Sequence, residues 1–244
     1  MHIEGIEHVD RRQAPGLRVE RTAGVATLTL DRPERNLLVP ELMDALRDAL
    51  LQADADDGVT AVVLTHAGET FCGGVDIAHM RASGADPVAY ATSMAGLLRV
   101  FPGLGTPVIA AVGGDALALG YSLVCCADIA ICTPSARLGT FEASVGMWPM
   151  LAQVPALKRL GARHALENIL TGEPFDARRA YEIGIVNRVV EQAELGDAVA
   201  AWAERVATAG AALAPGRRSA YRMLELSFDQ ALDEGVAEFV KLFA

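Results

Sequence analysis

Two continuous segments of strand length constrain the fold of this chain more than any other feature. They are Val59–Thr65 and Pro107–Val112, both dominated by apolar residues without a regular polar alternation. Such strands are typical of parallel sheets, which helices cover on both faces. Each segment is followed by a glycine-rich turn, so the sequence predicts an α/β domain with a largely parallel sheet.

The surrounding sequence supplies further elements. Val25–Leu30 alternates and is rich in β-formers, and Leu17–Glu20 is its expected hairpin partner. Pro40 opens a predicted helix at the position that proline favours, with Leu46 and Leu50 on its apolar face. One further strand is expected over 129–132, and helices are expected over 120–127, 154–160, 163–170, 177–183, 195–208 and from 217 to the end.

Composition excludes several classes of protein. The formal net charge of −10 argues against a nucleic-acid partner, and charged residues interrupt every apolar stretch before it could span a membrane. An anionic ligand would therefore need a local cation or a helix N-terminus. Hydrophobic residues make up 52% of the chain, which favours a buried interface between subunits.

The four cysteines, Cys72, Cys125, Cys126 and Cys132, have the spacing of neither a disulfide framework nor a zinc site. We expect reduced thiols in a cytoplasmic protein, and no metal. Residues 1–16 are polar and acidic and lack the features of a signal or transit peptide, so they are expected to form a flexible leader.

Three motifs in a fixed order carry a family resemblance. They are Phe71–Asp76, Ala111–Ser122 and Ala136–Gly146, and together they resemble the crotonase superfamily of enoyl-CoA hydratases, isomerases and relatives. The resemblance implies a spiral of ββα units over 17–190. It also implies a C-terminal helical oligomerisation region over 191–244 and assembly as a homotrimer or homohexamer.

The two turns are predicted to form an oxyanion hole. By position, the resemblance assigns its two backbone N–H donors to Val75 and Leu119, and Leu119 also precedes a short helix whose dipole would assist. Such donors stabilise charge on a thioester carbonyl oxygen. These side chains are larger than those of many relatives, and we expect them to narrow the mouth of the pocket.

One carboxylate stands where hydratases of this family have two. Glu142 matches the second family glutamate, whereas Ser122 occupies the position of the first and cannot ionise near neutral pH. Moving a double bond needs one base, so the residues favour an enoyl-CoA isomerase. The alternatives are a hydratase in which Ser122 helps to hold the water, and a non-catalytic acyl-CoA-binding protein.

The resemblance also suggests where coenzyme A would lie, as part of the substrate and with no tightly bound cofactor. The acyl end would run toward 77–100 and toward Trp148, and Ser83–Pro87 has the composition of a mobile loop. Asp76 is also expected to cap a helix, Asp115 to cap its turn, and His66 and His79 to have structural roles. The candidate coenzyme A contacts are Asn36, Leu37, Cys72, Gly74, Asp76, Ile77, Leu117, Gly120 and Arg222.

Overall fold

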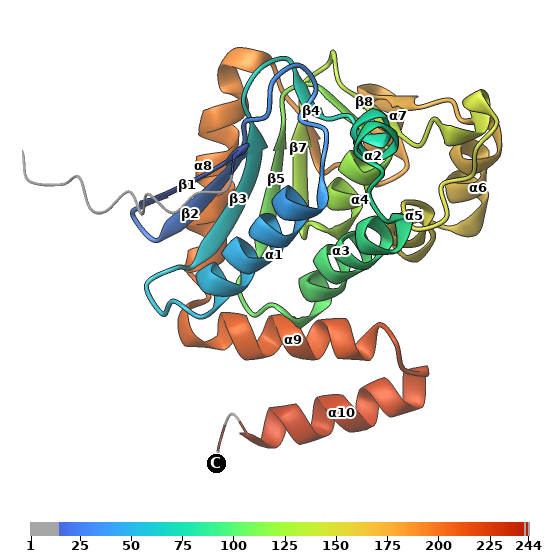
Figure 1. Ribbon diagram of the computed structural model, residues 1–244. Coiled ribbons are helices and arrows are strands. Elements are labelled where there is room, and N and C mark those ends of the chain that lie inside the picture. Colours follow the sequence, from blue (N-terminus) through green and yellow to red (C-terminus); the bar gives the residue numbers. More distant parts are fainter. Residues whose placement is uncertain (1–14, 242, 244) are drawn as a thin grey trace, which may run out of the picture.

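A six-stranded sheet forms the centre of the molecule. The computed structural model describes residues 15–241 and 243 (Figure 1), so the expected leader falls outside the described residues except for its last two. The sheet is parallel except for the antiparallel β1–β2 hairpin, which confirms the predicted strand pairing. Its strands, in spatial order, are β1 (Leu17–Thr22), β2 (Val25–Leu30), β3 (Ala61–His66), β5 (Val108–Val112), β7 (Ile129–Cys132) and β10 (Arg188–Val189).

A second, smaller sheet lies beside the first, and each repeating unit of the fold contributes one strand to each sheet. Its strands, in spatial order, are β4 (Thr70–Cys72), β6 (Asp115–Leu117), β8 (Arg137–Gly139) and β9 (Phe175–Asp176). The chain passes from β3 to β4, from β5 to β6 and from β7 to β8, and each pair is followed by helical structure. This repetition is the predicted spiral of ββα units.

Alternate residues of β3 pack against different layers. Ala61 and Val63 pack with the helix α8 (Leu195–Ala207), whereas Val62 and Leu64 belong to the main core with α1 (Pro40–Asp54). Figure 1 shows these two helices on opposite sides of the sheet. The strand is therefore buried on both faces, as predicted, and α8 is a layer of the core although it lies in the expected oligomerisation region.

The segment after the first turn is helical. It contains α2 (Ile77–Ser83) and α3 (Pro87–Val100), which lies along α1, and the 3-10 turn η1 (Phe101–Gly103) follows. Gly84 ends α2 in the left-handed conformation, and the Asp86 carboxylate accepts the Val88 N–H to start α3. Turn-forming residues at 84–86 thus separate two helices that the sequence analysis had not assigned.

The middle helices agree with prediction to within two residues at each end. They are α4 (Leu119–Cys126), α5 (Gln153–Arg159), α6 (Ala162–Thr171) and α7 (Ala177–Glu182). The short 3-10 turns η2 (Glu142–Val145), η3 (Gln192–Glu194) and η4 (Gly210–Ala212) complete this part of the chain.

The single helix expected from residue 217 to the end was wrong. Two helices are present, α9 (Leu213–Met223) and α10 (Phe228–Lys241). The Ser227 hydroxyl accepts the Gln230 N–H at 3.4 Å, and the Gln230 side-chain oxygen accepts the Ser227 N–H at 3.1 Å. This reciprocal pair is a capping box, and it starts a new helix where hydrophobic periodicity alone suggests continuity.

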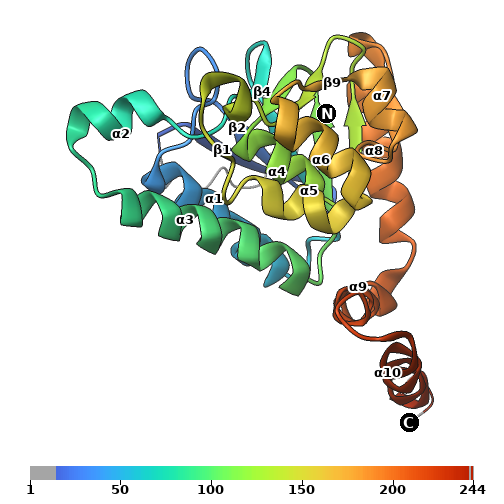
Figure 2. The same cartoon turned by 90° about the vertical axis from the view of Figure 1, so that its right-hand side faces the viewer.

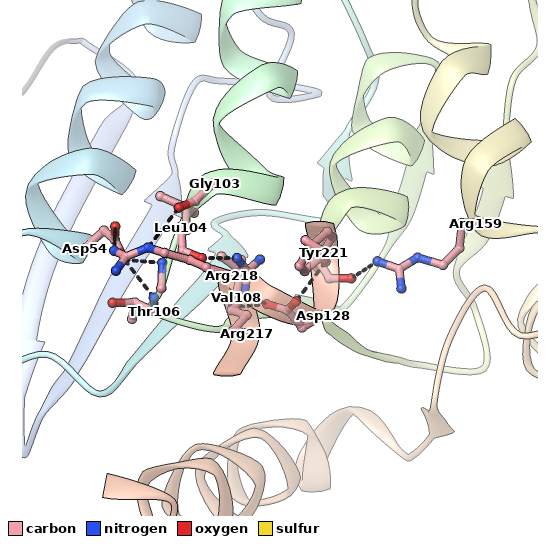
Figure 3. Close-up of polar contacts among 12 residues, drawn as sticks. Asp54, Gly103, Leu104, Thr106, Val108, Asp128, Arg159, Arg217, Arg218 and Tyr221 are labelled. Atoms are coloured by element: carbon pink, nitrogen blue, oxygen red, sulfur yellow. Dashed lines mark hydrogen bonds and ion pairs between the residues drawn. The ribbon is translucent and has the colours of Figure 1, made fainter. Parts of the chain in front are cut away.

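Charged groups hold α9 against the body of the protein (Figure 3). The Asp128 carboxylate accepts hydrogen bonds from Arg217 Nε at 3.0 Å and from the Tyr221 hydroxyl at 2.8 Å. Arg218 forms an ion pair with Asp54 at 2.9 Å. The helix α9 is therefore fixed to the last residue of α1 and to the residue that precedes β7.

The helix α10 extends away from the sheets, joined to the body through α9 (Figure 2). Arg222 on α9 holds it by ion pairs to Glu234 at 2.6 Å and Glu238 at 3.0 Å. Within the described residues, no helix has the length and apolar character needed to cross a membrane. Large apolar side chains remain exposed on and beside α10, namely Phe228, Leu232, Val236, Phe239, Val240 and Phe243.

Candidate active site

The two glycine-rich turns lie side by side at one edge of the small sheet. β4 and β6 are neighbouring parallel strands, so the chain leaves both of them at the same edge. A Cβ atom added to Gly74 would lie 2.7 Å from Ala118 Cβ and 3.6 Å from the Leu119 backbone nitrogen. The turns therefore approach each other at a distance that depends on glycine at position 74.

The first candidate donor is the backbone N–H of Val75. Leu38 pairs with Val75 in a single parallel bridge, in which the Leu38 N–H donates to Gly74 O at 2.8 Å and the Asp76 N–H donates to Leu38 O at 2.9 Å. Successive amides of an extended segment point in opposite directions, so the Val75 N–H points away from Leu38. In the described part of the chain this N–H has no hydrogen-bond acceptor, and it is free to meet a ligand.

The second candidate donor is the N–H of Leu119, the first residue of α4. An N–H in the first turn of a helix has no partner within the helix, and it lies at the positive end of the helix dipole. The Leu119 side chain is fully buried in the main core, whereas that of Val75 is half-buried. The expectation that the Leu119 side chain narrows the pocket mouth was therefore wrong, because only its backbone faces the turn.

Ala118, between β6 and α4, has a strained backbone. Its φ of 51° and ψ of −117° lie in a region that residues with a side chain rarely adopt. Its N–H donates to Gly139 O at 3.0 Å, and its carbonyl accepts the Ser122 N–H at 3.1 Å. Strain of this kind costs about 1–3 kcal/mol and is typical of functional sites, where the surroundings hold it in place.

Glu142 begins the 3-10 turn after β8. β8 pairs with β6, and Gly139 at the end of β8 lies opposite Leu117 at the end of β6, where the second turn begins. Glu142 follows Gly139 by three residues. The carboxylate is half-buried, and its Oε2 accepts the Phe141 N–H at 2.9 Å. Burial raises the pKa of Glu142 above its usual range, although backbone N–H groups of Glu142 and Phe141 partly oppose the shift.

A buried asparagine fixes the segment that carries Glu142. Asn168 on α6 accepts the Thr140 N–H at 2.7 Å and donates to Thr140 O at 2.8 Å. Its amide also donates to Glu173 O at 2.9 Å. The backbone two residues before Glu142 is therefore held by several hydrogen bonds in the interior. The sequence analysis missed Asn168, since an isolated asparagine in a helix gives no signal of this role.

Ser122, which the resemblance places opposite Glu142, is closed off from solvent. The side chain is fully buried, and its Oγ lies 2.8 Å from Ala152 O and 3.2 Å from Ala118 O. A hydroxyl has one proton to donate, and both of these neighbours accept. The proton is thus committed to the backbone, and the hydroxyl could donate to a water only by giving up these contacts.

The candidate coenzyme A residues Leu37, Ile77, Asn36 and Arg222 lie in three different settings. Those next to the first turn lie together: Leu37 is half-buried, with its Cδ2 3.0 Å from the position of a Cβ on Gly73, and Ile77 begins α2. The Asn36 side chain instead points inward, accepting the Arg32 N–H at 2.8 Å and donating to Ala67 O at 3.0 Å and to Thr70 O at 2.7 Å. Arg222 lies apart on α9, paired with carboxylates of α10.

The remaining candidates near the turns have structural partners. Asp76 caps α2 by accepting the His79 N–H at 2.8 Å, which confirms the predicted cap. Asp115 accepts the Arg137 backbone N–H at 3.0 Å and also pairs with its guanidinium. His66 Nε2 accepts the Gly113 N–H at 2.9 Å, and burial lowers the pKa of His66.

Cysteines and other metal-ligating residue types could in principle form a second site. The described chain has no cluster of histidine, cysteine and carboxylate groups suited to a metal ion. All four cysteines are free, as predicted. Burial raises the pKa of Cys72, whose Sγ lies beside the Gly74 N–H, to about 12. Cys72, Leu117 and Gly120 therefore serve as buried support beneath the turns.

Fold and site together define an enzyme of the crotonase superfamily, with two facing turns and a half-buried glutamate on the segment that follows the neighbouring strand β8. A family model described as enoyl-CoA hydratase/isomerase matches residues 20–242, and the chain belongs to this family.

Individual relatives cover most of both chains. A carnitinyl-CoA dehydratase from Proteus mirabilis is 32% identical over 219 residues, which are 88% of this chain and 83% of the relative. The structure of an enoyl-CoA hydratase from Mycobacterium smegmatis matches with a TM-score of 0.87 and 33% identity, covering 93% of this chain and 90% of that one. A family protein from Silicibacter pomeroyi matches with the same TM-score and 31% identity, over 93% of this chain and all of the other.

Proposed function

We propose that this enzyme moves a carbon–carbon double bond in an enoyl-CoA thioester, with Glu142 as its single acid and base. The observation that carries the proposal is the state of Ser122, whose proton is committed to Ala152 O and Ala118 O. Of the two positions that the family resemblance assigns to acid–base groups, Ser122 and Glu142, only Glu142 therefore offers an ionisable side chain. A reaction that needs a single proton carrier fits this arrangement better than one that must also position a water.

The chemistry follows from these groups. The thioester carbonyl oxygen of a 3-enoyl-CoA accepts hydrogen bonds from the N–H groups of Val75 and Leu119. The Glu142 carboxylate removes a proton from C2, and the electron pair passes into a dienolate whose charge the two N–H groups stabilise. The same carboxyl group returns the proton to C4, which leaves the double bond between C2 and C3. The raised pKa of Glu142 suits a group that must both take and give a proton.

Coenzyme A enters this proposal as part of the substrate. Its pantetheine arm would pass the first turn near Leu37 and Ile77, so that the thioester reaches Val75. The acyl chain would continue toward α3 and Trp148. Arg35, which is exposed and has its Nε 3.3 Å from the position of a Cβ on Gly73, is a cation available to a phosphate at this end.

Hydration is the second candidate reaction, because relatives are named as a hydratase and a dehydratase. The test is to incubate the protein separately with a 2-enoyl-CoA and a 3-enoyl-CoA and to identify products by mass and ultraviolet absorbance. The proposal expects the 3-enoyl substrate to gain the absorbance of a conjugated thioester without a change in mass. A product heavier by one water would establish the hydratase instead. Binding of both thioesters without turnover would establish a non-catalytic acyl-CoA-binding protein.

We also propose assembly as a homotrimer or homohexamer in the cytoplasm. Exposed apolar side chains gathered along α10 are typical of an interface between subunits, and four free thiols fit a reducing compartment. The acidic net charge makes nucleic acid an unsuitable partner. Sedimentation at micromolar concentration tests the assembly, and a monodisperse monomer would contradict it.

A further inference from the structure

Arg32 connects the two backbone segments that meet at the first candidate donor. It follows β2, and its guanidinium donates from Nη1 to Leu37 O and from Nη2 to Asp76 Oδ2, both at 2.8 Å. Leu37 precedes Leu38, the bridge partner of Val75, and Asp76 follows Val75. One side chain therefore spans the bridge and holds a residue on each side of it.

The position of Arg32 is itself fixed. Its backbone N–H donates to Asn36 Oδ1 at 2.8 Å, and the Asn36 amide donates in turn to Ala67 O, in the turn after β3, and to Thr70 O, at the start of β4. Its side chain is 28% exposed, and that of Asp76 is 11% exposed. An ion pair that is mostly shielded from water and anchored at both ends restricts its partners more than a surface pair does.

Because Asp76 follows Val75 directly, a restraint on the Asp76 side chain also restricts the backbone that carries the Val75 N–H. One of its carboxylate oxygens binds Arg32, and the other accepts the His79 N–H and so caps α2.

The buried Tyr90 hydroxyl has no hydrogen-bond partner among the described residues. Burial, together with the Asp76 and Glu41 charges, raises the pKa of Tyr90, which therefore keeps its proton near this carboxylate. Arg32 is the ion-pair partner of Asp76 within the described chain.

We propose that Arg32 is a positioning residue for catalysis, which sets the direction of the Val75 N–H by clamping Leu37 and Asp76. The inference rests on the proposed function, since it concerns the same oxyanion hole. Arg32 touches neither the substrate nor the reacting atoms. Its contribution is to hold one of the two donors in line with the carbonyl oxygen.

The test measures the donor directly as well as turnover. An aromatic enoyl-CoA whose absorption moves to longer wavelength when its thioester carbonyl accepts hydrogen bonds reports the oxyanion hole. Arg32→Met keeps the aliphatic stem but removes the clamp. We expect it to reduce the wavelength shift and to lower kcat about 10- to 100-fold, the cost of a donor displaced by about 1 Å, with little change in the affinity for the probe. Arg32→Lys should recover part of the loss, because a lysine can pair with Asp76 but cannot make the planar fork.

Two further variants keep the test decisive. Arg18→Met is the matched control, since Arg18 forms an ion pair with Asp31 at 3.2 Å in which both side chains are about half exposed, and it should leave both readouts unchanged. If Arg32→Met fails to fold, Asp76→Asn replaces it, because asparagine can still cap α2 without forming the ion pair. A full wavelength shift and full kcat in the clamp variants would overturn the inference. Turnover by the wild type without any shift in the bound probe would overturn the oxyanion hole itself, and with it the role of Arg32.

Discussion

Glu142 and Ser122, on the two sides of the candidate site, differ in how far they are buried and in whether their polar atoms are already bonded within the protein. On one side Glu142 is half-buried and its pKa is raised, while its segment is held from behind by Asn168. On the other side Ser122 is fully buried, and its hydroxyl is bonded to Ala152 O at 2.8 Å. One side presents an ionisable group, and the other has used its polar group to hold the structure together.

This difference shows that the position of a residue in a family motif does not by itself determine its role. Ser122 lies one turn into α4, close to the candidate donor Leu119, yet its hydroxyl is bonded within the protein interior. Glu142 lies in a short 3-10 turn, a less regular element, yet its backbone is well fixed. The contrast makes predictions that separate effects on catalysis from effects on stability.

The largest expected effect is on turnover, through Glu142→Gln. The amide keeps the shape of the side chain but cannot take up the substrate proton, so turnover should fall about 10²- to 10⁴-fold. The affinity for acyl-CoA should remain nearly intact and is measured by calorimetric titration. Glu173→Gln, which changes an exposed carboxylate in the loop after α6, is the control. A fully active Glu142→Gln variant would eliminate the mechanism.

The second prediction concerns the pH dependence of the same residue. A base must be ionised to accept a proton, so kcat/KM should decline as pH falls through the pKa of Glu142. Because burial raises that pKa, the midpoint of the decline should lie at a higher pH than for an exposed glutamate. A rate profile over the acidic range measures it. A midpoint at or below the ordinary glutamate value would contradict the assigned base or its burial.

Ser122→Ala should affect stability more than catalysis. Removing the hydroxyl leaves Ala152 O buried without this donor, and the free energy of unfolding should fall by about 1–3 kcal/mol, as measured by urea denaturation. Isomerase turnover should stay nearly unchanged. Ser83→Ala is the matched control, because the Ser83 hydroxyl also donates to a backbone carbonyl, His79 O at 2.7 Å, but is exposed. A large loss of turnover in Ser122→Ala at unchanged stability would return Ser122 to a catalytic role.

The smallest expected effect is a gain in stability from Ala118→Gly. Glycine relieves the strain at φ 51°, and this gain exceeds the entropic cost of glycine, so we expect a net increase of about 1 kcal/mol or less. Ala116→Gly, in β6 and without a positive φ, should instead lose about 0.5–1 kcal/mol. Equal losses in the two variants, measured by urea denaturation, would show that Ala118 is not strained.

Local sequence signals predicted the core elements well. The apolar segments became β3 and β5, and Pro40 occupies the start of α1 as expected. Such predictions succeed because they depend on periodicity and on backbone preferences that neighbouring residues share. The break before α10 was missed because the apolar pattern continues across it, while the cap at Ser227 depends on two side chains alone.

The candidate site was less accessible to prediction, because its contacts join residues that are distant in sequence. The Ser122 hydroxyl bonds to Ala152, thirty positions away, and the Arg32 guanidinium bonds to Asp76, forty-four positions away. The resemblance made Asn36 a candidate coenzyme A contact, yet its amide faces inward to Ala67 and Thr70. A motif supplies residue types at a given spacing, but only the folded chain decides which polar atoms remain available.

The hydrogen bond between Ser122 and Ala152 also limits how this protein can evolve. A glutamate at position 122 would have to place its carboxylate where the Ala152 carbonyl now lies, in a space that is already filled. The loop before α5 would therefore have to move in the same step. On the proposed one-carboxylate mechanism, a second acid at position 122 therefore calls for a change in the segment before α5 as well as at Ser122 itself.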